Sequence, residues 1–524
     1  MQKDSALLKN KKFLYATEFF SGMSIMAVEL GASRLLAPYF SSSQIVWTII
    51  IGTIMISLAL GNVWGGKMAD SDKNPAKLYK RLIFAAIWIG LIPIFGKYLI
   101  LVVAGALIVT IDTNLLIWAA FLSCMAIFVL PLFLLGTVTP SLVKYATDNL
   151  EHNGQIVGNL NAFNTIGSII GTFLPTFVTI PAVGTAITFL IFSGVLLLIG
   201  VIYFVSIGRK IFCAGAILIF ILSAAAGNAS NFAFWEKNLL YEGESIYNYL
   251  QVKDTPDKII FSTNVLFGVQ SLKIKSGELT GMYYDYALAA PLLADGKKIL
   301  ILGMGTGTFA EQCKKYFPDS KIKGVEIDEK ITALAKKYFN LPSDMEVFTY
   351  DGRAFLQSDK NIYDVILVDA FQDISPPFQM SSIEFFALVK NHLDKNGVMV
   401  VNMNMRGDIN EYLTDTIGKN FSAVRTIDAS GVTNKVLFAA VDKKILNNLR
   451  ARAEILDDKK LSRLMIHIAQ TWTTPALGEK ILTDDRAPVE MLSMRALDKI
   501  IQIHLEHYKE IYRRDGLEGI LKSI

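Results

Sequence analysis

The stretch "KKILILGMGTGTFAEQ" (residues 297–312) decides the fold of the second half of this chain. An apolar strand runs into a loop that carries three alternating glycines, Gly303, Gly305 and Gly307, and the loop leads into a helix. Glycine lets the backbone turn sharply and approach a ligand closely, and the N-terminus of the following helix favours polar ligand groups. The pattern therefore predicts a strand, a ligand-binding loop and a helix.

Strands and helices alternate from this stretch onward. Strand-like runs include "KIKGVEID", "MEVFTYD", "YDVILVDAF" and "GVMVVNM", and helical runs such as "KITALAKKYF" separate them. This alternation predicts a Rossmann-like α/β domain, in which helices cover both faces of a parallel sheet. The earlier runs "YNYLQVKD", "KIIFST" and "GVQSLKIK" predict a small antiparallel β-sheet in front of it.

Acidic residues follow several of these strands, where a parallel sheet binds its ligands. Glu326 stands about twenty residues after the glycine loop and is suited to accept both hydroxyls of a ribose. Asp351 could accept a hydrogen bond from an adenine amino group, and Asp369 and Asp373 lie beside the same crevice. The loop reads GxGxG without a flanking basic residue, which disfavours a dinucleotide and favours an adenosine that carries a sulfonium side chain.

The first half of the chain is dominated by apolar residues. About 20 such residues span a bilayer as a helix, and apolar stretches fall at 13–38, 45–66, 82–110, 115–143, 156–180, 186–207 and 211–226. Pro93, Gly96 and Lys97 interrupt the third stretch, which is either one tilted helix or a tight helical pair. We therefore predict an all-α transmembrane bundle of seven or eight spans.

The division into domains follows from these patterns. We expect a transmembrane bundle over 1–227, a linker and small β-sheet over 228–295, and the Rossmann-like domain over 296–524. Lysines and arginines gather before the first span and between the second and third, so the N-terminus should be cytoplasmic. Seven spans would place the C-terminal half outside and eight would place it inside. Because the inferred ligand is a cytosolic metabolite, we expect a multi-pass membrane protein with a cytoplasmic C-terminal domain.

Two acids lie within the first apolar stretch. Glu18 and Glu29 are eleven residues apart and so share one face of a helix. Acidic groups at membrane depth either line a path for cations or bind neighbouring helices and hold the bundle together. The sequence leaves both interpretations open.

Composition excludes some classes of protein. The net charge of +4 is small and spread along the chain, so nucleic acid is not an expected partner. The three cysteines, Cys124, Cys213 and Cys313, form no CxxC pair and suggest neither a disulfide framework nor a zinc site. We expect no metal.

Several motifs together resemble the spermidine synthase (polyamine aminopropyltransferase) family. They include "LTGMYYDYALAAPLL", "GVEID", "YDGRAF", "VDAF" and "LTDDRAPVE", and "ELGASRLLAPYFSSSQIVWT" in the apolar half resembles the bacterial branch that is fused behind a membrane bundle. The resemblance implies that decarboxylated S-adenosylmethionine donates an aminopropyl group to putrescine or a related amine. The products would be spermidine and methylthioadenosine, and no cofactor other than this co-substrate is implied.

The resemblance also assigns roles to residues. Asp369 would be the catalytic base, assisted by Tyr283. The donor-binding residues would be Gln270, Gly303, Gly305, Gly307, Glu326, Asp351, Gly352 and Asn248. The acceptor-binding residues would be Asp373, Asp485 and Tyr284.

This sequence departs from the family pattern at three of these points. Asp373 lies four residues after Asp369 where soluble members have a spacing of three, and Asn248 replaces a glutamine. The segment "LTDDRAPVE" replaces the family's usual C-terminal amine-site segment, and its Asp484 and Asp485 either bind the acceptor or cap a turn.

Two alternatives remain at this stage. A membrane methyltransferase on the same scaffold would use ordinary S-adenosylmethionine. A polyamine transporter with a synthase-like sensor domain would give Glu18 and Glu29 a role in transport. The oligomeric state is not fixed by the sequence, and a homodimer is compatible with it.

Overall fold

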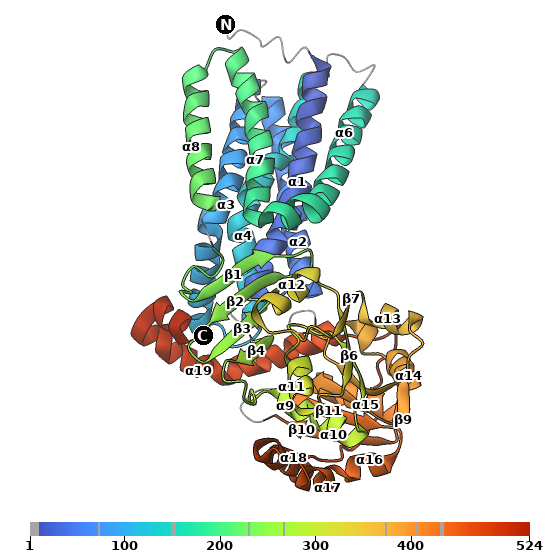
Figure 1. Cartoon of the computed structure of the whole chain (residues 1–524). Coiled ribbons are helices and arrows are strands. Elements are labelled where there is room, and N and C mark those ends of the chain that lie inside the picture. The colour runs from blue at the N-terminus through green and yellow to red at the C-terminus, as the bar shows by residue number, and fades with distance from the viewer. Residues whose placement is uncertain are drawn as a thin grey trace.

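A bundle of helices forms the N-terminal half of the protein (Figure 1). The structure is a computed structural model that describes residues 10–71, 74–147, 153–228, 231–265, 268–371, 375–403, 407–429 and 434–523. The helices of the bundle are α1 (Lys11–Phe40), α2 (Gln44–Ser71), α3 (Pro75–Thr110), α4 (Leu115–Gly136), α5 (Val138–Ala146), α6 (Asn153–Leu174), α7 (Ile180–Ser206) and α8 (Lys210–Asn228). A short π-helical turn, Pro175–Thr179, leads from α6 towards α7.

Six stretches of the described chain are long and apolar enough to cross a membrane, and one of them, Asn153–Ser206, contains both α6 and α7. A backbone break at Gly184, where φ is 81°, lies near the start of α7. The third apolar stretch forms one continuous helix, α3, which includes Pro93. The alternative of a helical pair in this stretch, which would have raised the count to eight, is therefore wrong.

Close packing of α1 against α6 depends on glycine. A Cβ atom on Gly167 would lie 2.0 Å from the carbonyl oxygen of Phe19, and one on Gly171 would lie 2.0 Å from that of Met23. The side chain of Glu18 is fully buried at the same contact and accepts hydrogen bonds from Thr139 at 2.5 Å and Asn164 at 2.8 Å. Glu18 therefore joins α1 to α5 and α6.

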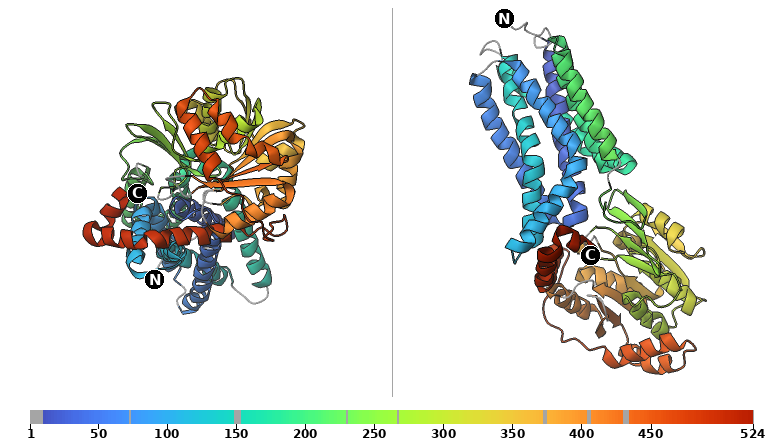
Figure 2. Two further views of the ribbon diagram at one scale, coloured as in Figure 1. Left: turned by 90° about the horizontal axis from the view of Figure 1, so that it is seen from below. Right: turned by 90° about the vertical axis from the view of Figure 1, so that its left-hand side faces the viewer.

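The two ends of the bundle differ. α1 begins at the end away from the C-terminal half, and α8 finishes at the end beside it, so the start of the described chain and the C-terminal half lie at opposite ends (Figures 1 and 2). Where each long helix crosses a membrane, these two ends face opposite sides of it, which conflicts with the expectation that both are cytoplasmic; the location of the C-terminal domain stays a prediction.

A four-stranded antiparallel sheet follows the bundle. Its strands, in spatial order, are β1 (Leu239–Glu244), β2 (Tyr249–Asp254), β3 (Lys258–Ser262) and β4 (Ser271–Ile274). Leu250, Val252 and Phe261 of this sheet pack against Ile331 and Leu334 of α12 (Glu329–Tyr338). The predicted small antiparallel sheet is present.

The described residues of the C-terminal domain form a seven-stranded sheet in the order β10-β11-β9-β8-β5-β6-β7. Its strands are β5 (Lys298–Leu302), β6 (Lys321–Glu326), β7 (Glu346–Thr349), β8 (Tyr363–Val368), β9 (Leu393–Met403), β10 (Ala423–Asp428) and β11 (Lys435–Ala440). Strands β5 to β9 pair in parallel, whereas β11 and β10 add antiparallel pairs at one edge. The predicted Rossmann-like sheet is confirmed, and the antiparallel edge is an addition to it.

Helices cover both faces of this sheet because its strand residues alternate in direction. Ile299 and Ile301 of β5 belong to the core on one face, with helices α9 (Tyr283–Ala287), α10 (Ala289–Ala294) and α11 (Thr308–Tyr316). Leu300 and Leu302 belong to the core on the other face, with α13 (Gly352–Ser358), α14 (Ile383–Asn391) and α15 (Asp408–Asn420). The strand order reverses direction between β5 and β8, so the loops after these two strands open into one crevice.

The two halves share a packed interface. The backbone N–H of Val265 donates to the carbonyl of Pro38 at 3.0 Å, and Glu244 accepts two hydrogen bonds from Thr185, at 2.7 and 2.6 Å. The C-terminal helix α19 (Val489–Ser523) crosses the lower end of the bundle and contacts α3 (Figures 1 and 2). Met494, Leu497 and Leu505 of α19 belong to the same hydrophobic core as the bundle.

Candidate active site

A cavity of about 290 Å³ opens at the carboxyl ends of β5, β6 and β8. The structure brings together most of the residues that the sequence predicted for the site. Those that line the cavity are Asn248, Gln270, Tyr283, Tyr284, Gly303, Gly305, Glu326, Asp351, Gly352 and Asp369. Gly307 and Asp485 do not line it, and Asp373 lies outside the described residues.

The glycine loop has the backbone that its sequence predicts. Gly303, Gly305 and Gly307 all have positive φ, at 82°, 56° and 82°, which is a region that glycine enters without steric cost. A Cβ atom on Gly303 would lie 2.5 Å from the carbonyl oxygen of Asp369, so this glycine permits the close approach of two strand ends. Gly307 instead precedes α11, where a Cβ atom would meet Leu341. Gly307 therefore turns the chain into α11, and its expected contact with the ligand stays a prediction.

Asp369 lies directly after β8, and its side chain reaches the cavity. The hydroxyl of Tyr283 donates a hydrogen bond to Oδ2 of Asp369, and Nδ2 of Asn402 donates to Oδ1 at 2.8 Å. Burial raises the pKa of the Asp369 carboxyl to about 7, although the hydrogen bonds from Tyr283 and Asn402 act to lower it. A carboxyl group with such a pKa can take up and release a proton near neutral pH.

The two tyrosines of α9 form one wall beside Asp369. Their rings contact each other in a tilted arrangement, with centroids 4.0 Å apart and an interplanar angle of 42°, and both side chains are buried. Burial raises the pKa of the Tyr283 hydroxyl, and the negative charge of Asp369 raises it further, so this hydroxyl stays protonated and donates. The Tyr284 hydroxyl donates to the carbonyl oxygen of Gln270 at 2.7 Å. Gln270 directly precedes β4, so this hydrogen bond holds the start of β4 against α9 at the wall of the cavity.

Glu326 is held by backbone groups at the end of β6. Its carboxylate accepts hydrogen bonds from the N–H groups of Gly305, at 2.8 Å, and Asp328, at 3.1 Å. Burial raises the pKa of Glu326 to about 7, and these backbone hydrogen bonds act in the opposite direction. The glycine loop and the acid after β6 are therefore connected directly.

Asp351 and Gly352 stand where the chain turns from β7 into α13. Oδ1 of Asp351 accepts a hydrogen bond of 2.8 Å from the N–H of Ala354, as an N-cap residue does. A Cβ atom on Gly352 would lie 3.0 Å from the end of the Met380 side chain. Both residues line the cavity next to Glu326.

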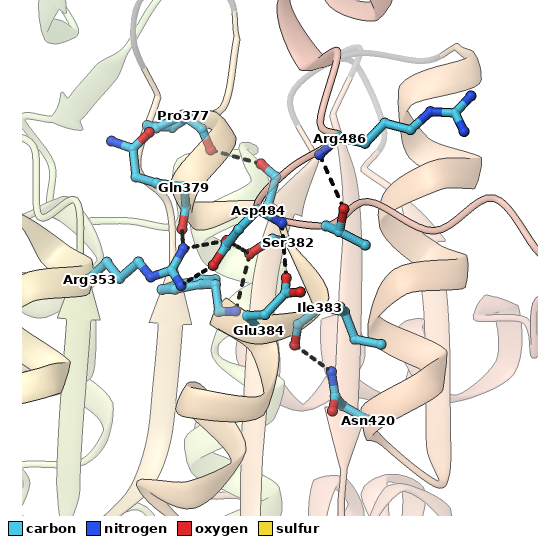
Figure 3. A network of polar contacts seen from close by, with 12 residues as sticks. Arg353, Pro377, Gln379, Ser382, Ile383, Glu384, Asn420, Asp484 and Arg486 are labelled. Atoms are coloured by element: carbon cyan, nitrogen blue, oxygen red, sulfur yellow. Dashed lines mark hydrogen bonds and ion pairs between the residues drawn. The ribbon is translucent and has the colours of Figure 1, made fainter.

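Asp484, in the segment "LTDDRAPVE", has a structural role. Asp484 forms a two-pronged ion pair with Arg353, with both distances 2.6 Å, and accepts a hydrogen bond of 2.5 Å from Ser382 (Figure 3). The hydrogen bond from Arg353 lowers the pKa of the Asp484 carboxyl. Asp485 is exposed in the adjoining turn. The prediction that Asp485 binds the acceptor is therefore not supported, because its neighbour fastens this turn outside the cavity.

Sequence reasoning missed two asparagines in the site. Asn402 of β9 binds Asp369, and Nδ2 of Asn434 in turn donates to Oδ1 of Asn402 at 2.9 Å. Both residues line the cavity. The available signal was a polar residue within the buried run "GVMVVNM", because a buried amide requires hydrogen-bond partners.

The fold and this site, which combine a glycine loop, two strand-end acids and a buried carboxyl group beside them, are typical of transferases that bind an adenosyl donor. Among the described residues, no three His, Cys, Asp or Glu side chains come together as a metal site. Comparison with known proteins narrows this class. Residues 284–433 match the family model described as "Spermine/spermidine synthase domain".

Similar proteins point to the same family. A "Probable polyamine aminopropyl transferase" from Bifidobacterium longum is 49% identical over 346 residues, which cover 62% of this chain and 78% of the relative. The polyamine aminopropyltransferase of Vibrio vulnificus is 29% identical over 33% of this chain and 62% of the relative. The chain belongs to the polyamine aminopropyltransferase family, and it is a transferase.

One solved structure that resembles this chain is the spermidine synthase of Thermotoga maritima. It has 17% sequence identity and a TM-score of 0.37, and the match covers 44% of this chain and 84% of that chain.

Proposed function

We propose that the protein transfers an aminopropyl group from decarboxylated S-adenosylmethionine to putrescine or a related amine. The acceptor nitrogen attacks the carbon bound to the sulfonium, the C–S bond breaks, and its electron pair remains on sulfur. The products are methylthioadenosine, the lengthened amine and a proton. The observation that carries this proposal is the carboxyl group of Asp369, which enters the same cavity as the glycine loop and Glu326.

Asp369 supplies the base that this reaction needs. An alkylammonium group has a pKa near 10, so the nitrogen must lose a proton before it can attack. A carboxyl group whose pKa is about 7 is matched to accept that proton near neutral pH. Its charge also attracts the ammonium group of the donor and that of the acceptor, which brings the two cations together.

The donor is held by groups that suit an uncharged nucleoside. Glu326 is oriented by two backbone N–H groups and can accept hydrogen bonds from ribose hydroxyls. Asp351 is in position to accept from an adenine amino group, and Gln270 and Asn248 close the side of the cavity formed by the small sheet. No metal or further cofactor is required by this assignment.

Product analysis tests the proposal. The purified full chain in detergent should release methylthioadenosine from decarboxylated S-adenosylmethionine and putrescine, and Asp369→Asn should lower kcat at least about 100-fold. Asp485→Asn is the matched control, because Asp485 is an exposed aspartate that does not line the cavity, and it should retain full activity. Turnover of ordinary S-adenosylmethionine to its homocysteine product, with no aminopropylated amine, would instead support a methyltransferase.

We also propose that the bundle anchors the transferase in a membrane. Large apolar side chains are exposed on the outer surfaces of α2, α6, α7 and α8, including Met55, Leu60, Val63, Ile166, Ile169, Phe173, Leu198 and Leu222. A water-soluble surface rarely carries so many of them, whereas lipid tails accept them. Six stretches of sufficient length and hydropathy support the same proposal.

The charges at the two ends of the bundle favour one orientation. Basic residues at the end away from the C-terminal half are Lys11, Lys12, Lys67, Lys77, Lys80, Arg81, Lys144, Arg209 and Lys210. The turns at the other end, 41–43, 111–114 and 175–184, contain no lysine or arginine, and the basic residues of α1 and α3 nearest to that end are Arg34 and Lys97. Basic loops remain in the cytoplasm, so we propose that the transferase domain faces the opposite side of the membrane, an orientation in which its cytosolic donor has to cross the membrane to reach it.

Reporter fusions at the C-terminus test this orientation. Alkaline phosphatase fused after residue 524 should be active, and green fluorescent protein at the same position should be dark. The same reporters fused at the N-terminus serve as the internal control and should give the reverse pattern. A fluorescent C-terminal fusion in intact cells would overturn this orientation.

A further inference from the structure

A second cavity, of about 320 Å³, lies where the bundle meets the transferase domain. One wall is the turn between α1 and α2, from Ser41 to Gln44, together with Trp47 of α2. The opposite wall is the segment 375–379, which follows β8, and the first turn of α19 contributes Glu490. Pro377 and Gln379 line both this cavity and the one that contains Asp369, so the two are neighbours.

The lining of the second cavity suits a positive charge. Glu490 is the charged residue among its described lining residues, and no lysine or arginine accompanies it. Oε2 of Glu490 accepts a hydrogen bond of 2.7 Å from the backbone N–H of Gln44, and Oε1 accepts none from the described residues. Trp47 and the half-exposed Phe378 add two aromatic rings, and ring faces attract cations.

A third cavity, of about 190 Å³, shares Ser42 and Trp47 with the second and has a different character. It shares Tyr247, Asn248 and Thr263 with the catalytic cavity. Its wall includes Arg34, whose guanidinium donates to the carbonyl oxygen of Ile246. Glu244, which lines the same cavity, interacts electrostatically with this guanidinium. No lysine or arginine is among the described residues that line the second cavity with Glu490, so an elongated amine is directed towards Glu490.

We propose that the cavity around Glu490 and Trp47 binds the distal ammonium group of an amine acceptor longer than a diamine. The nitrogen of the amine that reacts lies at Asp369. The remainder of the amine passes Pro377 and Gln379 to reach the bundle. This inference rests on the proposed function and adds the acceptor class to it, namely amines with a third, distal positive charge. The membrane bundle thus contributes side chains to substrate selection.

Steady-state kinetics with a short and a long acceptor test the subsite. The wild-type full chain in detergent should have a lower KM for the triamine spermidine than for the diamine putrescine. Glu490→Gln retains an oxygen for the Gln44 N–H but removes the charge, and should raise the KM for spermidine about tenfold. The KM values for putrescine and for the donor should not change. Trp47→Leu should have the same selective effect through loss of the aromatic ring.

A matched control separates the subsite from a general loosening of the interface. Asp112→Asn removes the 2.7 Å ion pair between Lys509 of α19 and the turn after α3, and Asp112 does not line the cavity. It should leave all KM values unchanged. Equal KM values for spermidine in the wild type, Glu490→Gln and Trp47→Leu, with normal turnover of putrescine, would overturn the subsite alone. A wild-type chain that releases no methylthioadenosine with any amine would overturn the proposed function, and the subsite with it.

Discussion

Asn402, on β9, donates a hydrogen bond of 2.8 Å to Oδ1 of Asp369, at the end of the neighbouring strand β8. The bond favours the charged carboxylate and so opposes the effect of burial on the pKa of Asp369. Asn434 holds Asn402 in place from behind. The proton affinity of the proposed base is therefore set partly by an amide that does not need to touch the substrate.

The first prediction concerns pH dependence. A base must be deprotonated to act, so kcat/KM should fall as pH decreases through about 7, the pKa of Asp369. Asn402→Ala removes a hydrogen bond to the carboxylate, which raises that pKa and moves the acidic limb to higher pH. We expect activity about tenfold below wild type near pH 6 and a much smaller difference above about pH 8. Asn396→Ala, at an exposed position of the same strand, should leave the profile unchanged, and a parallel loss at every pH would contradict the argument.

The second prediction concerns the donor. In Glu326→Gln, the amide NH₂ must face one of the two backbone N–H groups that Glu326 now accepts, from Gly305 or Asp328. We expect the affinity for decarboxylated S-adenosylmethionine and for methylthioadenosine to fall at least about tenfold, measured by calorimetric titration. Glu329→Gln, three residues away and exposed, is the control. Unchanged nucleoside binding in Glu326→Gln would remove Glu326 from the donor site.

The third prediction concerns the glycine loop. Gly303→Ala places a Cβ atom 2.5 Å from the carbonyl oxygen of Asp369 at a φ of 82°, and should reduce the free energy of unfolding by about 1–3 kcal/mol. Because the clash displaces the backbone of Asp369, the proposed base, the activity should fall as well. At Gly305 the nearest group to a new Cβ atom is the Ser271 hydroxyl, at 3.2 Å, so Gly305→Ala should lower Tm less. Thermal melting compares the two variants, and the reverse order of Tm values would refute the steric explanation.

The fourth prediction concerns the bundle. Gly171→Ala adds a Cβ atom 2.0 Å from the Met23 carbonyl oxygen on α1, and such overpacking should destabilise the protein by about 1–3 kcal/mol. Gly158→Ala lies on the same helix, α6, with nothing within 4 Å of the new atom. It should be neutral or slightly stabilising, since alanine has the higher helix propensity. Melting in detergent measures the difference, and equal Tm values for the two variants would show that α1 and α6 do not pack this closely.

The sequence was most informative where geometry follows from the fold class alone. Parallel strands bring their carboxyl ends to one edge, so Glu326 and Asp369 meet there whatever the details of the loops. The alternating glycines predicted a sharply turning loop, and all three have positive φ in the structure. The family motifs then supplied Tyr283, which local patterns could not have identified as a partner of Asp369.

The failures involve contacts between residues that are distant in the chain. Asp485 and Asp484 were equivalent in the sequence, and only the fold brings Arg353 to Asp484, 131 positions away. Asn402 lies within a buried apolar strand, where the hydrophobic pattern conceals a single polar side chain. The antiparallel strands β10 and β11 pair beyond β9, and a local pattern does not determine to which edge of a sheet a hairpin attaches.

The many contacts between the halves have a practical consequence for biochemistry. Hydrogen bonds from Val265 to Pro38, from Thr185 to Glu244 and from Gln44 to Glu490 cross the boundary at separate places, and α19 returns to the bundle after the transferase domain is complete. A protease nick between α8 and β1 should therefore leave the two pieces attached to each other. Removal of the bundle to obtain a smaller, soluble enzyme would expose apolar side chains of α19 to water. It would also remove one wall of the cavity that we propose for the distal ammonium group of the acceptor.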